Sequence, residues 1–205
     1  MVGRVAIHAS VLAAGFFIVM TALKAIRSPW MVDDFPEALA IKAELMPVIF
    51  PVHMITGGLV LILVPLTVLT RLRPRWHRWA GRITAAVVVP AGLTAFPVAL
   101  IEPVTWASAL GFTMQGALWL VLLGLGITHI RAGRVARHRA CMLLMAAATS
   151  GAVFFRIYLA LFALWGSPRF YEVFYACDAW IAWGLPVLAT AFFLKRTGAW
   201  AAERQ

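Results

Sequence analysis

The chain has 205 residues, of which 63% are hydrophobic and only 13% are charged, and its formal net charge is +10. An ordinary soluble domain is about half apolar and about a quarter charged, so this composition excludes that class. A strongly positive chain could bind nucleic acid, but the positions of its basic residues, described below, are typical of a membrane protein instead.

Six long apolar stretches follow one another along the chain. The hydrocarbon core of a bilayer is about 30 Å thick and is crossed by about 20 helical residues. Long unbroken apolar runs favour helices over the alternating pattern of a membrane barrel, and a helix satisfies its own backbone hydrogen bonds in lipid. We therefore expect an all-α, polytopic bundle that forms one integral membrane domain over residues 1–205. The predicted transmembrane helices are 5–23, 48–70, 83–101, 104–128, 140–165 and 177–194.

The connections between these helices differ in charge. Basic residues concentrate before helix one, in the connections 71–82 and 131–139, and after helix six, whereas most acidic residues lie in the other connections. Cytoplasmic connections of membrane proteins are enriched in Lys and Arg. This pattern predicts a multi-pass protein of the inner (plasma) membrane with both termini in the cytoplasm. The lipid bilayer is the expected partner, with anionic lipids attracted to the basic connections, and nucleic acid is not.

A short motif occurs twice. The pattern R-x-x-x-H-R is found at 73–78 and again at 134–139, which places predicted helices two and three over helices four and five. Parallel repeats of helical hairpins are a known membrane architecture. A tandem hairpin repeat would make helices two to five a four-helix core flanked by helices one and six; chance similarity between alanine-rich segments is the other interpretation. The connection 28–47 is expected to carry a short interfacial helix.

Several of these motifs also suggest a family. The pattern H-x-I-x-G-G-x-x-L begins at His53, the run 75–82 contains paired His-Arg and Gly-Arg, the run 137–142 reads R-H-R-A-C-M, and Arg156 follows. Together they resemble the bacterial membrane proteins grouped as domain-of-unknown-function family 2306, over about residues 48–165. The family usually carries Trp where this chain has Cys141. The resemblance implies a multi-pass fold and no particular activity.

A looser similarity is to cytochrome b561 proteins, which are six-helix membrane electron carriers. In them, histidines on the four central helices hold two haem groups. Here four histidines fall one on each predicted central helix or at its edge, namely His53, His77, His129 and His138. The similarity is one of architecture, and it implies haem b as the cofactor to consider.

Two histidines are predicted near the cytoplasmic face, because His77 opens helix three and His138 opens helix five. Two imidazoles at equal depth on facing helices can hold a haem iron, and nearby arginines can pair with its propionates. We therefore consider His77 and His138 as haem ligands, with His129 able to replace either one. The alternative is that these histidines are interfacial residues that reinforce the topology.

A second polar group is predicted in the outer half of the membrane. His53 and Arg156 lie at similar depth there, and an arginine within a membrane usually faces the bundle interior or an anionic partner. Arg156 could bind a carboxylate, a quinone or a haem propionate, or it could form an ion pair with Glu102 or Asp178. The repeat places Met114 opposite His53, which adds His/Met haem ligation as an alternative.

These residues lead to two hypotheses about function. The first is a b-type haem protein that transfers electrons, with quinone or a redox partner protein as donor or acceptor, and that could be a membrane oxidoreductase. The second is a non-redox membrane protein, either a small transporter or an accessory subunit that binds lipid or a partner. In the second case His53 and Arg156 would line a polar pocket.

Overall fold

The computed structural model describes residues 2–31 and 37–198, with side chains over 12–31 and 39–198, and every regular element in these ranges is helical. Within these ranges, six helices are long and apolar enough to cross a membrane, which confirms the predicted all-α membrane bundle. The elements are α1 (Val2–Arg27), η1 (Ser28–Trp30), α2 (Glu37–Leu45), α3 (Ile49–Leu69), η3 (Thr70–Leu72), α4 (Pro74–Leu100), α5 (Trp106–Arg131), α6 (Val135–Trp165), η4 (Pro168–Phe170) and α7 (Tyr171–Arg196).

The membrane helices extend further than the apolar runs. Helices α4 and α6 begin at Pro74 and Val135, within the basic connections, rather than at the predicted positions 83 and 140. Arginine is a good helix former, and proline is favoured in the first turn of a helix, so these connections are helical although they are polar. Helix α5 begins with a capping box, in which the Thr105 hydroxyl accepts a hydrogen bond from the Ser108 amide at 3.0 Å.

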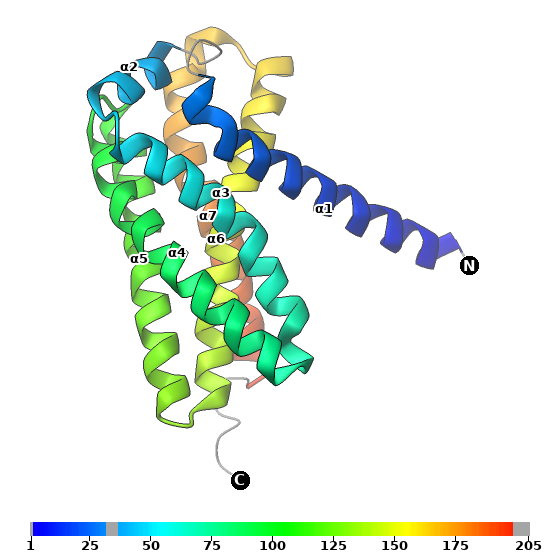
Figure 1. Ribbon diagram of the computed structural model, residues 1–205. Helices are drawn as coiled ribbons and strands as arrows, with labels where there is room; N and C mark the ends of the chain where they lie inside the picture. The colour runs from blue at the N-terminus through cyan, green and yellow to red at the C-terminus, as the bar shows by residue number, and fades with distance from the viewer. Residues whose placement is uncertain (1, 32–36, 199–205) are drawn as a thin grey trace.

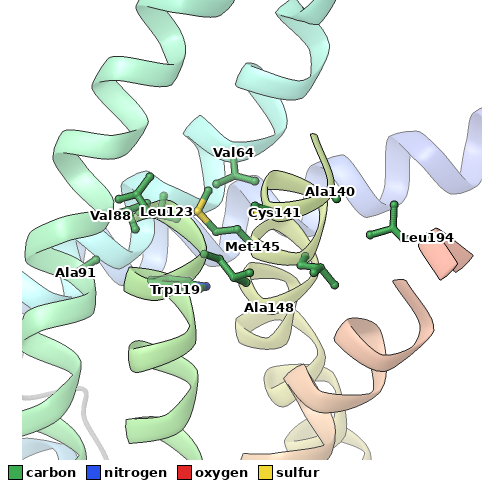
Figure 2. Packing of buried hydrophobic residues seen from close by; sticks show 13 residues of the cluster. Val64, Val88, Ala91, Trp119, Leu123, Ala140, Cys141, Met145, Ala148 and Leu194 are labelled. Atoms are coloured by element: carbon green, nitrogen blue, oxygen red, sulfur yellow. The ribbon is translucent and has the colours of Figure 1, made fainter. Parts of the chain in front are cut away.

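Helices α3 to α6 form the centre of the bundle. Helix α4 packs between α3 and α5, helix α5 packs on α6, and α3 also meets α6, so the four helices form a ring (Figure 1). Helix α7 lies against α5 and α6, and α1 lies against α3. The main buried apolar cluster comes from α3 to α6, with Leu194 as its contribution from α7 (Figure 2). The predicted four-helix core with two flanking helices is therefore confirmed.

Glycine allows the closest contacts between flank and core. A Cβ atom on Gly58 of α3 would lie 2.8 Å from the carbonyl oxygen of Ala22 on α1, and one on Gly151 of α6 would lie 2.5 Å from the Cβ atom of Trp183 on α7. Small residues at such crossings let membrane helices approach closely. Beyond its crossing with α3, the amino-terminal half of α1 extends away from the bundle (Figure 1).

The connections gather at two ends of the bundle. The basic end contains η3, the α5–α6 connection and the carboxyl end of α7; the α2 end contains α2 and the α4–α5 and α6–α7 connections (Figure 1). Helix α2 is the short helix expected within 28–47, although residues 32–36 of that connection lie outside the described residues. The basic connections therefore share one end, as the predicted topology requires. Placing that end in the cytoplasm stays a prediction from the charge pattern.

Candidate functional site

A cavity of about 420 Å³ lies inside the bundle, toward the α2 end. Small-molecule sites usually occupy about 300–1,000 Å³ and have mainly apolar walls with a few polar groups. The walls here fit that description, since they are mostly aliphatic and aromatic. The ring-bearing apolar residues in the lining are Phe50, Phe112, Trp119, Phe155 and Trp183.

The few polar groups of the lining include both residues predicted for the outer half, His53 and Arg156. They come from α3 and α6, and the charge of Arg156 acts on His53. The other polar side chains are Lys42, Ser108, Gln115, Tyr171 and Tyr175, and no aspartate or glutamate is among the described residues that line the cavity. The cavity therefore contains two cationic side chains without a carboxylate.

The ring of His53 is held by the neighbouring helix α4. Its Nδ1 lies 3.2 Å from the carbonyl oxygen of Ala91 and 3.2 Å from the hydroxyl of Thr94, and that hydroxyl itself donates to the Pro90 carbonyl at 2.6 Å. A carbonyl oxygen only accepts, so Nδ1 carries the proton in this arrangement. In a neutral ring Nε2 is then free to accept a hydrogen bond or to bind a metal.

Arg156 lies in the interior of α6, within a membrane span. Its Nη1 donates to the carbonyl of Ala152 one turn earlier, at 2.7 Å, and this is its only hydrogen bond among the described residues. The other N–H groups of the guanidinium have no protein acceptor there. The alternative ion pairs are not formed, because Glu102 is exposed in the α4–α5 connection and neither carboxylate oxygen of Asp178 has a hydrogen-bond partner.

Lys42 of α2 is a cavity residue that the sequence did not indicate. Its side chain is only 8% exposed, and its ammonium donates to the carbonyl of Val98 at 2.9 Å and also to that of Ile101. These carbonyls end helix α4, where a positive charge is favourable. Burial lowers the pKa of Lys42, and the negative charge of Glu102 partly opposes that shift. Helix α2 is thus tied to α4 at the end of the bundle where the cavity lies.

Met114 is not brought to His53. It lies on the outer surface of α5, where it is 51% exposed, and it does not line the cavity. The next residue, Gln115, lines the cavity instead and donates from Nε2 to the carbonyl of Ala148 at 2.8 Å. Neighbouring residues of a helix lie at almost the same level but point about 100° apart. The predicted level on α5 was therefore right, but Gln115 rather than Met114 faces the cavity.

The remaining predicted residues lie toward the basic end. Nδ1 of His77 is 3.0 Å from the carbonyl oxygen of Thr67, and Nδ1 of His138 is 2.9 Å from that of Gly126. Each ring is thus turned toward the preceding helix of its own hairpin, α3 or α5, and this equivalence supports the tandem hairpin repeat. Nδ1 of His129 is buried without a partner in the described part of the chain.

A haem iron needs only two protein side chains as ligands, fewer than most other metal sites. Among the described residues, no group of three or more His, Cys, Asp or Glu side chains could hold a metal ion. The ring of His77 and the ring of His138 each keep Nε2 available after the hydrogen bond at Nδ1. Their role as haem ligands stays a prediction.

Comparison with known proteins places this architecture in a family. The family model described as predicted membrane protein (DUF2306) matches residues 50–194, from the start of α3 to the last turns of α7. No curated protein and no solved structure matches the chain. The matched region includes both hairpins, α7 and the cavity residues His53 and Arg156. The chain therefore belongs to the DUF2306 family of predicted membrane proteins.

Proposed function

We propose that the protein binds an amphipathic molecule with an anionic headgroup in the cavity at the α2 end. The observation that carries this proposal is the charge of the lining: Arg156 and Lys42 contribute two cations, and no described lining residue is acidic. A cation buried without a partner in a membrane is unfavourable, because the low dielectric does not replace its hydration. A bound anion would supply the charged partner that Arg156 lacks among the described residues.

The arrangement of the polar groups also suits such a ligand. Arg156 has unused N–H donors, and planar guanidinium groups bind carboxylate and phosphate oxygens well. His53 offers Nε2 in the same cavity, with its ring held by Ala91. The aromatic and aliphatic walls would take an alkyl chain or a ring system, since burial of apolar surface is favourable at about 25 cal/mol per Å².

A b-type haem is the second candidate for the same cavity, and one contact favours it. Histidines that bind metals usually donate their other ring nitrogen to a carbonyl or carboxylate, and His53 does so through Nδ1 to Ala91. A haem is also an amphipathic anion, so Arg156 would hold a propionate while His53 would bind the iron through Nε2. When bound, such a haem would supply one-electron transfer, for which quinone is the proposed exchange partner.

The binding of a matched pair of probes tests the proposal. Radiolabelled dodecanoate is bound to the purified protein in a scintillation proximity assay, and dodecanol, decyl-ubiquinone and haemin are added as competitors. Dodecanol has the same chain without the charge, and we expect it to compete at least about tenfold less well than unlabelled dodecanoate, because a hydrogen bond to a charged group contributes about 1.5–3 kcal/mol. Haemin that competes better than dodecanoate would support the second candidate.

Equal competition by dodecanol and dodecanoate would contradict the anionic headgroup. Strong competition by decyl-ubiquinone alone would identify a neutral quinone site and would also reject the charge argument. The melting temperature of each sample shows whether a competitor acts by binding or by unfolding the protein, since a bound ligand raises stability.

A further inference from the structure

Asp178 is a buried carboxyl group that the cavity does not use directly. It lies in α7 within the membrane span 168–196 and is only 2% exposed. Neither of its carboxylate oxygens has a hydrogen-bond partner among the described residues. Buried polar groups are nearly always hydrogen-bonded, and an ionised carboxylate without partners is far more costly to bury than a neutral one. The burial of Asp178 and its lack of hydrogen-bond partners among those residues therefore favour the protonated, uncharged acid.

On helix α7, Asp178 lies between residues that line the cavity. Tyr175, one turn earlier on α7, and Ala179, the next residue, both line the cavity. The charges of Asp178 and of Arg156 both act on Tyr175, which lines the cavity. A negative charge on Asp178 would therefore change the electrostatic potential inside the cavity.

The helices that pack beside Asp178 bring few charged or titratable groups into the cavity. Helix α7 packs against α5 and α6. From α6 the cavity receives Arg156, and α7 itself contributes Tyr171 and Tyr175, whereas α5 contributes only uncharged polar groups, Ser108 and Gln115. No cation in the described part of the chain pairs with Asp178.

We infer that Asp178 is protonated while the cavity holds its anion, so that the neutral acid favours anion binding and its ionisation opposes it. The inference rests on the proposed function for the identity of the anion. A carboxylate at position 178 would repel an anionic headgroup, and the neutral acid does not. When the acid ionises, its O–H proton leaves for water at the α2 end, the electron pair stays on the carboxylate, and the anion is held less tightly.

The sign of the pH dependence follows from this linkage. Dodecanoate should bind most tightly while Asp178 is protonated. Its affinity should fall as rising pH ionises the acid, because the carboxylate repels the anionic headgroup. Loss of a proton from His53 would change the affinity in the same direction. A variant that removes the carboxyl group of Asp178 and keeps His53 is therefore needed to separate the two effects.

Infrared spectroscopy of the ligand-free protein tests whether Asp178 is protonated. The wild-type protein at neutral pH should show the C=O stretching band of a protonated carboxylic acid, and Asp178→Asn should lack it. Glu172→Gln is the matched control on the same helix, since Glu172 is exposed and its substitution should leave the band unchanged. A wild-type spectrum without an acid band, or a band that persists in Asp178→Asn, would overturn the inference whether or not any ligand binds.

The coupling between the ionisation of Asp178 and anion binding is tested by measuring dodecanoate affinity as a function of pH. The wild-type protein and Glu172→Gln should show the fall, and Asp178→Asn should keep high affinity across the same pH range. If Asp178→Asn fails to fold, the wild-type band itself remains decisive, because it must disappear over the same pH range in which affinity falls. An acid band together with pH-independent affinity would reject the coupling while leaving the anion site intact. Absence of dodecanoate binding at every pH would reject the proposed function instead.

Discussion

The imidazole of His53 and the guanidinium of Arg156 reach the same cavity from α3 and α6, two helices of the central ring. Each is held by a backbone carbonyl of the core: Nδ1 of His53 by Ala91 on α4, and Nη1 of Arg156 by Ala152 on its own helix. Within the described part of the chain, these contacts leave Nε2 of His53 as a free acceptor and the remaining N–H groups of Arg156 as free donors. A membrane bundle with such a pair is organised to hold a polar headgroup within an otherwise apolar space.

The crossing of α1 and α3 should depend on Gly58. In Gly58→Ala the new methyl group would lie 2.8 Å from the carbonyl oxygen of Ala22 and from the side chain of Ile26, so the helices must separate. Overpacking of this kind typically destabilises by about 1–3 kcal/mol. Gly124→Ala is the control, because nothing lies within 4 Å of the added atom. Thermal unfolding in detergent should show a lower midpoint for Gly58→Ala only, and equal midpoints would show that α1 is not packed there.

The buried ammonium of Lys42 should make stability depend on pH in the alkaline range. Its folded-state pKa is lowered below the ordinary value of 10.5, so the unfolded chain binds the proton more tightly. The stability of the wild-type protein should therefore rise as pH increases from the folded-state pKa toward 10.5. Lys42→Met removes this contribution, so the melting temperature of the variant relative to wild type should decrease over that interval. A constant difference between the two proteins would contradict the burial of a charged Lys42.

The haem candidate predicts a particular order among histidine variants. If haemin gives a Soret band and a sharp reduced α-band, the cavity site predicts that His53→Ala abolishes them, while His77→Ala and His138→Ala keep them. The latter two variants lose the hydrogen bonds to Thr67 and Gly126, and we expect each to lower stability by about 1 kcal/mol. Loss of both bands in His77→Ala and His138→Ala, with retention in His53→Ala, would place the haem at the basic end.

The predicted topology can be tested with single cysteines introduced into a background that lacks Cys141 and Cys177. Ser167 lies in the α6–α7 connection and Arg134 in the α5–α6 connection, and both positions are exposed. A membrane-impermeant maleimide added to intact cells with a permeabilised outer membrane should label Ser167→Cys. It should label Arg134→Cys only after the inner membrane is disrupted. The reverse pattern would invert the orientation inferred from the charge bias.

The amino-acid sequence was sufficient to predict which segments form the long helices and that His53 and Arg156 lie at a similar level of the bundle. Both follow from hydrophobic length, because a bilayer has a fixed thickness and a helix has a fixed rise. This is why His53 and Arg156 were expected at one level, where the cavity is found. The hairpin motif around His77 and His138 likewise predicted which helices form the core.

Helix rotation and the contacts of the short helix could not be predicted in the same way. The choice between Met114 and Gln115 depends on a rotation of about 100°, which an apolar run does not reveal when all its faces are hydrophobic. Lys42 joins the cavity only because α2 folds back over the end of α4. Asp178 was expected as a partner of Arg156 from depth and charge alone, but the two side chains do not pair.

The affinity of dodecanoate for Arg156→Gln, compared with wild type, is the measurement that tests the central claim most directly. The substitution keeps a polar side chain but removes the positive charge, and we expect affinity to fall by about tenfold or more. Arg169→Gln is the matched control, because Arg169 is an exposed arginine of η4 that does not line the cavity. Weak binding by Arg156→Gln with normal binding by Arg169→Gln is the predicted result. Equal affinities in all three proteins would contradict an anion site at Arg156.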